Sequence, residues 1–194
     1  MFKFRLLFCA LFLALALPAG AWAQSGKTYV SLKTSQGDIV LELDPGTAPK
    51  TVANFLQYVK SGHYDGTIFH RVIKNFMIQG GGFDPKMQQK KTGAPIANEA
   101  AGGLKNDKYT VAMARTGDPH SATAQFFINT KDNDFLNFTA ENEQGWGYAV
   151  FGKVVKGQDV VDKIAGVKTG RISAFEDVPV MPVIIEKATL VDKP

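Results

Sequence analysis

Short strand-like segments separated by turn residues run through most of this sequence, and this pattern constrains the fold more than any other feature. Residues 29–34 and 39–43 alternate apolar and polar side chains on either side of a turn-forming stretch, which predicts an opening β-hairpin. Further strands are predicted in apolar, β-branched or aromatic runs at 67–73, 76–79, 96–99, 109–115, 125–130, 148–154 and 183–191. Because strands and helices do not alternate regularly, we expect a mainly antiparallel sheet, either closed into a barrel or folded as a sandwich.

Two segments carry a helical pattern instead. Pro49 stands where a first helical turn tolerates proline, the apolar residues at 52, 55, 56 and 59 share one helix face, and Ser61 and Gly62 provide an end. Between Gly157 and Gly166, apolar residues at 160, 161 and 164 predict a second, shorter helix. The glycine run at 80–82 marks a place where the backbone turns or where another group packs closely against it.

The N-terminus has the pattern of a secretory signal peptide. Lys3 and Arg5 precede an unbroken apolar run at 6–17, and a small-x-small cleavage site follows at 21–23. We therefore expect a signal peptide at 1–23 and one mature domain at 24–194. A membrane anchor needs about 20 apolar residues, and no later segment has them, so the mature protein is expected outside the cytoplasm without an anchor.

The remaining composition excludes several classes of function. The single cysteine, Cys9, lies in the predicted signal peptide, so the mature chain cannot form disulfides, thiolate metal sites or a cysteine nucleophile. Without the two basic residues of that peptide, 20 basic residues stand against 18 acidic ones, a net charge of +2, so nucleic acid is not the expected partner. His63, His70 and His120 lack close ligand spacing and no G-x-S-x-G motif occurs, so neither a metal, another cofactor nor Ser-His-Asp hydrolysis is predicted.

Arg71 is the residue that most suggests a binding site. In simple alternation it shares a strand face with Phe69 and Ile73, so a guanidinium would stand on an otherwise apolar face. Such a face is typical of a binding cleft. The alternative is a solvated face on which the arginine stem covers apolar surface.

The register of the hairpin around Arg71 decides which residues accompany it. A two-residue turn would pair Arg71 with Ile78, whereas a three-residue connection, with Asn75 or a neighbour in the left-handed conformation, would pair it with Gln79. Only the second register puts Arg71, Met77 and Gln79 on one face. We predict the second register.

Several sequence blocks together resemble the cyclophilin family of peptidyl-prolyl cis-trans isomerases. They recur in family order from about residue 28 to residue 191: Phe69-His70-Arg71, Phe76-Met77-x-Gln79-Gly80-Gly81, Met113-Ala114, Gln125-Phe126-Phe127-Ile128 and Val150-Phe151-Gly152-Lys153-Val154. The resemblance implies a closed eight-stranded antiparallel barrel capped by two helices. With its predicted signal peptide, the chain is most similar to the periplasmic cyclophilins of Gram-negative bacteria, which implies a periplasmic location, with full secretion as the alternative.

The resemblance also implies roles for individual residues. Arg71 would be the catalytic guanidinium and Gln79 its orienting partner. The substrate-binding residues would surround the proline ring or line the peptide groove: Phe76, Met77, Phe127, Leu136, Ala114, Arg115, Gln125, Phe135 and Tyr148. Phe126 points opposite Phe127 by strand alternation and is predicted to belong to the core.

Three positions depart from the best-known eukaryotic pattern of the family. Arg115 replaces an asparagine, Phe135 a tryptophan and Tyr148 a histidine. Because Phe135 lacks the indole N–H, a ligand that needs this donor loses a hydrogen bond worth about 0.5–1.5 kcal/mol, and cyclosporin is expected to bind weakly. A monomer is expected.

The leading hypothesis is a prolyl isomerase that acts on proline-containing, unfolded or flexible polypeptides during the folding of exported proteins. One alternative is a chaperone or surface module that binds proline peptides with little turnover, motivated by the departures at Arg115 and Phe135. Another is an all-β carrier of an apolar ligand, which a filled barrel interior would exclude.

Overall fold

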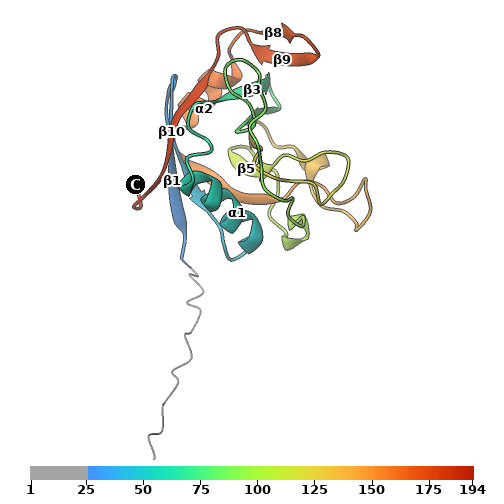
Figure 1. Ribbon diagram of the computed structural model, residues 1–194. Coiled ribbons are helices and arrows are strands. Elements are labelled where there is room, and N and C mark those ends of the chain that lie inside the picture. The colour runs from blue at the N-terminus through green and yellow to red at the C-terminus, as the bar shows by residue number, and fades with distance from the viewer. Residues whose placement is uncertain (1–25) are drawn as a thin grey trace, which may run out of the picture.

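Eight antiparallel strands form a closed barrel in the computed structural model, which describes residues 26–194. The predicted signal peptide at 1–23, with Cys9, lies outside the described residues. The ring of neighbouring strands runs β1-β10-β3-β4-β6-β5-β7-β2, and Figure 1 shows β1 beside β10. The barrel strands are β1 (Thr28–Thr34), β2 (Gly37–Leu43), β3 (Thr67–Ile73), β4 (Met77–Gly80), β5 (Thr110–Met113), β6 (Phe126–Asn129), β7 (Val150–Lys156) and β10 (Ile184–Val191).

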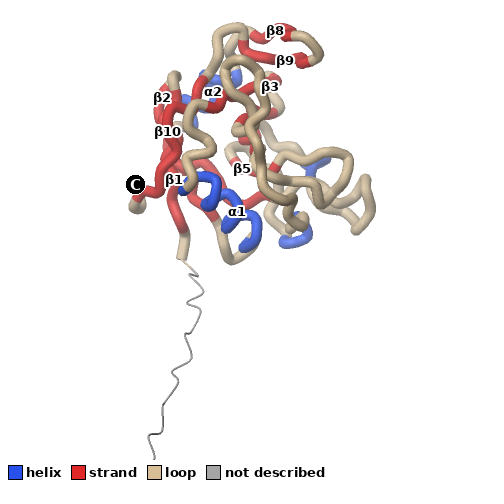
Figure 2. Tube along the Cα trace, in the orientation of Figure 1, coloured by secondary structure: helices blue, strands red, loops and turns tan. Residues whose placement is uncertain are grey.

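The barrel closes because β1 bonds to a strand on each side. It pairs with β2 in the predicted opening hairpin, where Val30 lies opposite Leu41, and with β10, where Leu32 lies opposite Ala188. The strand pattern left a barrel and a sandwich open, and the structure confirms the barrel that the resemblance implied. Long loops, drawn tan in Figure 2, connect β4 to β5, β5 to β6 and β6 to β7.

Two helices cover the barrel core. α1 (Pro49–Lys60) and α2 (Gln158–Ala165) lie at the two predicted positions, and Figure 1 shows them towards opposite ends of the barrel. α1 contributes the buried residue Phe55 to the core, and α2 contributes Ile164. Among residues 26–194, neither helix has the length and apolar character needed to cross a membrane.

Side chains fill the interior of the barrel. Large residues from both helices and most strands are fully buried in one cluster: Leu32, Ile39, Leu41, Leu43, Phe55, Tyr64, Phe69, Ile78, Phe126, Ile128, Phe151 and Ile164. This packing argues against the hypothesis that the barrel carries an apolar ligand, because such a carrier needs an enclosed space for its cargo.

The prediction of a strand at 96–99 is wrong. Only Ile96 in this segment forms a β-bridge, with Ala122. The backbone after it does not pair with a strand, because the Asn98 amide donates a hydrogen bond to Nδ1 of His120 (3.1 Å). The sequence also missed a hairpin outside the barrel. It consists of β8 (Thr169–Ile172) and β9 (Phe175–Pro179), which form a separate two-stranded sheet.

Glu99 supplies the N-terminal cap of α1 from a distant part of the chain. The residue at the cap position, Ala48, makes no side-chain hydrogen bond. The Glu99 carboxylate instead accepts hydrogen bonds from the backbone amides of Lys50 (3.1 Å) and Thr51 (2.8 Å) and from the Thr51 hydroxyl (2.7 Å). These amides have no partner within the helix, so Glu99 ties the loop before β5 to the start of α1.

Replacing Glu99 with alanine is expected to lower the free energy of unfolding by about 1–2 kcal/mol, because the partly buried start of α1 loses its acceptors and a favourable negative charge. Urea unfolding followed by circular dichroism measures this loss. Glu143→Ala, at an exposed loop position, is the matched control and should change stability little. Equal stability of the two variants would contradict the capping role.

Candidate active site

The β3–β4 hairpin has the register predicted from its sequence. Arg71 lies opposite Gln79 and Ile73 opposite Met77, and Asn75 in the connection has a left-handed backbone with φ of 57°. Asparagine tolerates this conformation better than most residues. Arg71, Met77 and Gln79 therefore lie on the same outer side of the barrel.

One expectation about this strand is wrong, because the pairing contains a bulge. Phe69 lies opposite Gly80 and Arg71 opposite Gln79, so His70 is an additional residue in β3. A bulge shifts the alternation of side chains. Phe69 is consequently buried in the barrel core instead of sharing a face with Arg71, which is exposed.

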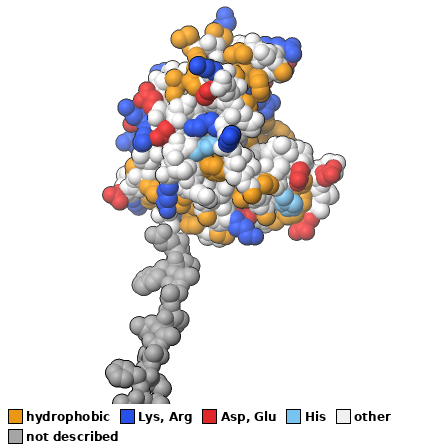
Figure 3. Space-filling view, in the orientation of Figure 1, with side chains coloured by type: hydrophobic (Ala, Val, Ile, Leu, Met, Phe, Trp, Pro, Cys, Tyr) orange, Lys and Arg blue, Asp and Glu red, His pale blue; other side chains and the backbone are white. Residues whose placement is uncertain are grey.

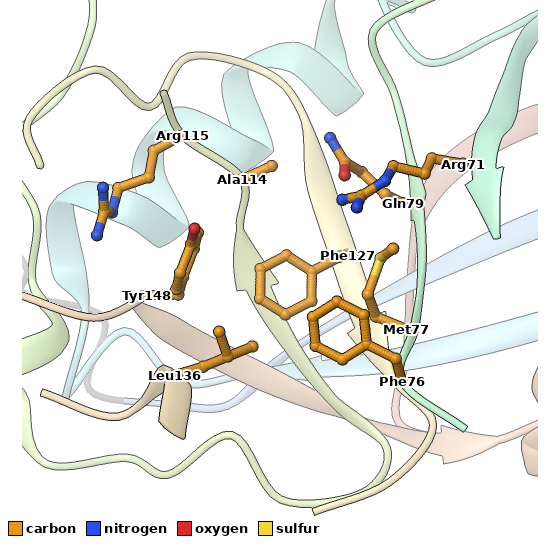
Figure 4. Close-up of a pocket in the computed structure, with 9 residues that line it drawn as sticks. All are labelled: Arg71, Phe76, Met77, Gln79, Ala114, Arg115, Phe127, Leu136 and Tyr148. Carbon is orange, nitrogen blue, oxygen red and sulfur yellow. The ribbon is translucent and has the colours of Figure 1, made fainter. Parts of the chain in front are cut away.

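Nine of the eleven predicted site residues line one pocket of about 100 Å³ on the outside of the barrel. Figure 4 shows them around a common space. They are Arg71, Phe76, Met77, Gln79, Ala114, Arg115, Phe127, Leu136 and Tyr148. Segments far apart in the sequence thus meet here, on β3, β4, β6, the β3–β4 turn and the loops beside β5 and β7.

The floor of the pocket is apolar. Met77, Phe127 and Leu136 are buried in a second apolar cluster, separate from the barrel core. The ring of Tyr148 meets that of Phe127 edge to face at 5.6 Å between centroids. Phe126, the neighbour of Phe127, is fully buried in the barrel core, as strand alternation predicted.

The two arginines at this pocket differ in how their guanidinium groups are used. Arg115 donates from Nε to the carbonyl of Gly147 (2.9 Å) and from Nη1 to that of Thr116 (2.8 Å), and it lies 4.6 Å from the Tyr148 ring centroid. The side chain of Arg71 has neither an ion pair nor a hydrogen bond to another residue in the described range 26–194. Its guanidinium points to the side of Gln79 and Phe127 (Figure 4), where its donors are free for a ligand.

The predicted pair of Arg71 and Gln79 face each other across the hairpin, but Gln79 bonds in another direction. Its Nε2 donates to Oε1 of Gln125 (2.9 Å). The glycine run fits this arrangement: Gly81 has φ of 82°, and a Cβ on Gly82 would lie 2.5 Å from Cγ of Gln125. Gln125 lines the two spaces next to the pocket instead of the pocket itself.

Phe135 does not line the pocket either. Its side chain is 74% exposed and stacks on Phe76, with ring centroids 5.6 Å apart and an angle of 27° between planes. The two rings form an apolar rim beside the pocket, which a bound peptide could cover.

A chain of buried asparagines, which was not predicted from the sequence, holds the pocket walls. Asn133 donates to the carbonyl of Phe76 (2.9 Å) and to the side chain of Asn129 (2.7 Å), which donates in turn to Asn106 (3.2 Å). Asn106 also donates to the carbonyl of Leu136 (3.1 Å). Asn129 at the end of an apolar strand was the available signal, because asparagine is rare in strands.

The three histidines lie in separate surroundings. Nε2 of His63 contacts the Gly81 carbonyl, and His120 accepts from Asn98. Within residues 26–194, no three His, Cys, Asp or Glu side chains are placed to hold a metal ion.

His70 is buried, and its Nδ1 has no hydrogen-bond partner in the described part of the chain. Burial, reinforced by the positive charge of Arg71, lowers the pKa of His70 from 6.5 to about 4.

This shift predicts an acid-sensitive fold. Between pH 6.5 and 4 the unfolded chain binds a proton at His70 and the folded chain does not. The free energy of unfolding is therefore unaffected by His70 above this range, and it decreases by up to about 3 kcal/mol as the pH falls through the range. Urea midpoints at pH 7.5 and 4.5 measure the loss. The His70→Gln variant should show a smaller loss of stability in acid. Part of the loss should remain, because burial also lowers the pKa of His63. The exposed His120, changed to Gln, is the control, and an unreduced loss in His70→Gln would contradict the assignment.

Comparisons with known proteins agree with this fold. The family model described as cyclophilin type peptidyl-prolyl cis-trans isomerase/CLD matches residues 29–190. A peptidyl-prolyl cis-trans isomerase of Streptomyces antibioticus is 71% identical over 161 residues, covering 83% of this chain and 97% of its own. Peptidyl-prolyl cis-trans isomerase B of Escherichia coli K12 is 62% identical, covering 83% and 98%. Isomerase A of Dickeya dadantii is 50% identical, covering 93% and 94%.

Solved structures show the same similarity. A crystal structure of a Cryptosporidium parvum cyclophilin type peptidyl-prolyl cis-trans isomerase superposes with a TM-score of 0.74 at 30% identity, covering 87% of this chain and all of the other. A second structure of that protein, determined in the presence of the dipeptide Ala-Pro, has a TM-score of 0.72 at 29% identity, covering 85% and 99%.

Proposed function

Because this chain belongs to the cyclophilin-type peptidyl-prolyl cis-trans isomerases, we propose that it accelerates X-Pro isomerisation in exported proteins as they fold, with Arg71 stabilising the twisted imide. Its enzyme class is peptidyl-prolyl isomerase. One observation carries the proposed role of Arg71. Its guanidinium lies beside an apolar pocket and has no partner within residues 26–194, whereas the guanidinium of Arg115 is held by backbone carbonyls.

The chemistry of an X-Pro bond suits such an arrangement. Partial double-bond character gives the bond a rotation barrier of about 18–20 kcal/mol, while the two isomers differ by only about 0.5–1 kcal/mol. In the twisted transition state the imide nitrogen becomes pyramidal and regains its lone pair. A donor aimed at this nitrogen therefore stabilises the transition state more than either planar ground state. An arginine guanidinium suits this role because it remains charged and offers several donors.

The pocket provides the complementary grip on the ring. Its apolar floor of Met77, Phe127 and Leu136 fits a proline side chain, and the polar edge at Gln79 fits the peptide backbone beside it. If the ring is held here, the carbonyl before proline can rotate past Arg71 without a bond being broken. The Ala-Pro dipeptide named for the Cryptosporidium structure supports proline peptides as ligands.

The expected place of action is the periplasm. The signal-peptide pattern at 1–23 supports export, with a mature protein that begins at Gln24, and the family likeness favours the periplasm over full secretion. Because a single chain supplies all nine residues of the pocket, we propose that a monomer is active. Phe135 lacks an N–H donor and lies at the rim, so we also propose weak cyclosporin binding. N-terminal sequencing of protein recovered from a periplasmic extract tests the processing site.

The decisive experiment measures isomerisation directly. Two-dimensional exchange NMR of an Ala-Pro-Phe peptide, with catalytic amounts of the mature protein, should show rapid cis-trans exchange that the uncatalysed peptide lacks. Peptide binding without accelerated exchange would contradict the proposed turnover and favour a proline-peptide-binding chaperone or surface module.

A further inference from the structure

A second and larger cavity, of about 470 Å³, lies between the barrel and the β8–β9 hairpin. Arg71 and Gln79 line both this cavity and the first pocket. A peptide whose proline occupies the first pocket therefore has room to continue into the second space. The remaining lining comes from β3, the segment after β4, Gln125 and residues 174–177 of the hairpin.

Aromatic rings form one wall of this second cavity. The rings of His70 and Phe83 lie 4.6 Å apart, and the Phe83 and Phe175 rings meet edge to face at 5.2 Å. Phe83 is buried, whereas Phe175 is exposed at the mouth. Other apolar side chains on or just after the hairpin, Ile172, Val180 and Met181, are also exposed, and hydrophobic atoms appear on that part of the surface in Figure 3.

The hairpin brings two carboxylates to the same cavity. Glu176 makes one loose ion pair with Arg171, at 3.7 Å, in which both side chains are largely exposed. Asp177 is half-buried and has neither an ion pair nor a hydrogen bond from its side chain within residues 26–194. The guanidinium of Arg71 points towards the first pocket (Figure 4). Because buried His70 has a pKa of about 4, it adds no positive charge near neutral pH.

We propose that this second cavity binds a lysine or arginine side chain of the client polypeptide, close in sequence to the proline in the first pocket. The aliphatic stem and cationic head of such a side chain suit an aromatic wall that ends at two carboxylates. An acidic side chain would meet the like charges of Glu176 and Asp177 there, and Arg71, the one permanently cationic side chain among the lining residues, points its guanidinium towards the first pocket. This inference rests on the proposed function, because it takes the first pocket as the proline site.

The test uses peptides that contain one proline and differ at a single position. Lysine, glutamine and glutamate are placed in turn at each of the two positions before proline and the three after it. Exchange NMR gives kcat/KM, and titration gives Kd, so the cavity is tested even if turnover is absent. At one position or two neighbouring ones we expect lysine to exceed glutamate by about three- to tenfold, the effect of one or two solvent-exposed ion pairs.

Charge variants of the hairpin identify the source of this preference. Glu176→Gln combined with Asp177→Asn should bring the lysine-to-glutamate ratio close to one. Asparagine also keeps a residue that tolerates the left-handed backbone of Asp177, whose φ is 59°. Glu176→Lys should reverse the preference, which a misfolded variant could not do. Asp38→Asn with Glu186→Gln removes the same charge away from both cavities and should keep the wild-type ratio.

The outcomes separate the two proposals. Absence of a lysine preference at all five positions, or a preference that the double variant retains, would overturn the second cavity as a cation site. A missing rate enhancement for the glutamine peptides would instead contradict the proposed isomerase function, while the Kd ratio would still decide the role of the cavity. Added salt should reduce the preference, because the carboxylates are partly exposed.

Discussion

Replacing Arg71 with alanine is expected to lower kcat/KM for a proline peptide by about two to three orders of magnitude. A preorganised donor aimed at developing charge is worth about 3–4 kcal/mol of transition-state stabilisation, and each 1.36 kcal/mol is a factor of ten. Arg71 is exposed and has no ion pair or hydrogen bond within residues 26–194 that its loss would break. The fold should therefore persist, with a melting curve close to that of the wild type.

Two further variants make this result specific. Arg71→Lys keeps the charge but loses the planar fork of donors, and we expect it to recover only part of the rate. Lys74→Ala removes an exposed cation from the turn of the same hairpin and should preserve kcat/KM. Exchange NMR of one peptide measures all three variants. Arg71→Ala activity within fivefold of the wild type would refute the proposed mechanism.

The largest expected loss of stability follows from Phe126→Ala. Phe126 is fully buried and contacts the rings of Phe55 and Tyr64 edge to face, both at 5.5 Å between centroids. Truncating a buried phenylalanine costs about 3–5 kcal/mol, through lost transfer free energy and the closed cavity that remains. Urea unfolding at neutral pH measures the change.

The adjacent Phe127 provides the matched comparison on the opposite face of β6. Phe127→Ala enlarges a pocket that already opens to solvent, so no closed cavity remains and the stability loss should be smaller. Its activity loss should be the greater of the two, because the proline site loses its floor. If Phe127→Ala were the more destabilised variant and Phe126→Ala the less active one, the assignment of the two faces would be reversed.

Local patterns predicted the parts of the site that depend on local geometry. Two turn lengths were compatible with the hairpin, and the register with Asn75 in a left-handed conformation was predicted because only it places Arg71, Met77 and Gln79 on one face. Strand alternation, which is also local, correctly placed Phe126 in the core and Phe127 on the opposite face of β6. The positions of Arg115, Leu136 and Tyr148 in the pocket came from the family resemblance, since no local rule brings such distant segments together.

Other features escaped the sequence because their causes are not local. The bulge at His70 depends on the pairing of β3 with β4, and it moved Phe69 into the core against simple alternation. The β8–β9 hairpin has short strands with mostly exposed side chains, so it carries no apolar alternation. The exposure of Phe135 follows from how its loop packs on Phe76, which residue type alone does not determine.

The closed ring of strands has a consequence for an enzyme that would handle unfinished proteins. An open sheet exposes a row of unpaired amides and carbonyls, which recruits extended chains and promotes aggregation. In this barrel β1 has a partner on each side, and so does each other strand of the ring. Under the proposed function, the barrel therefore offers an extended client no free strand edge on which to assemble, and only the short β8–β9 hairpin keeps open edges.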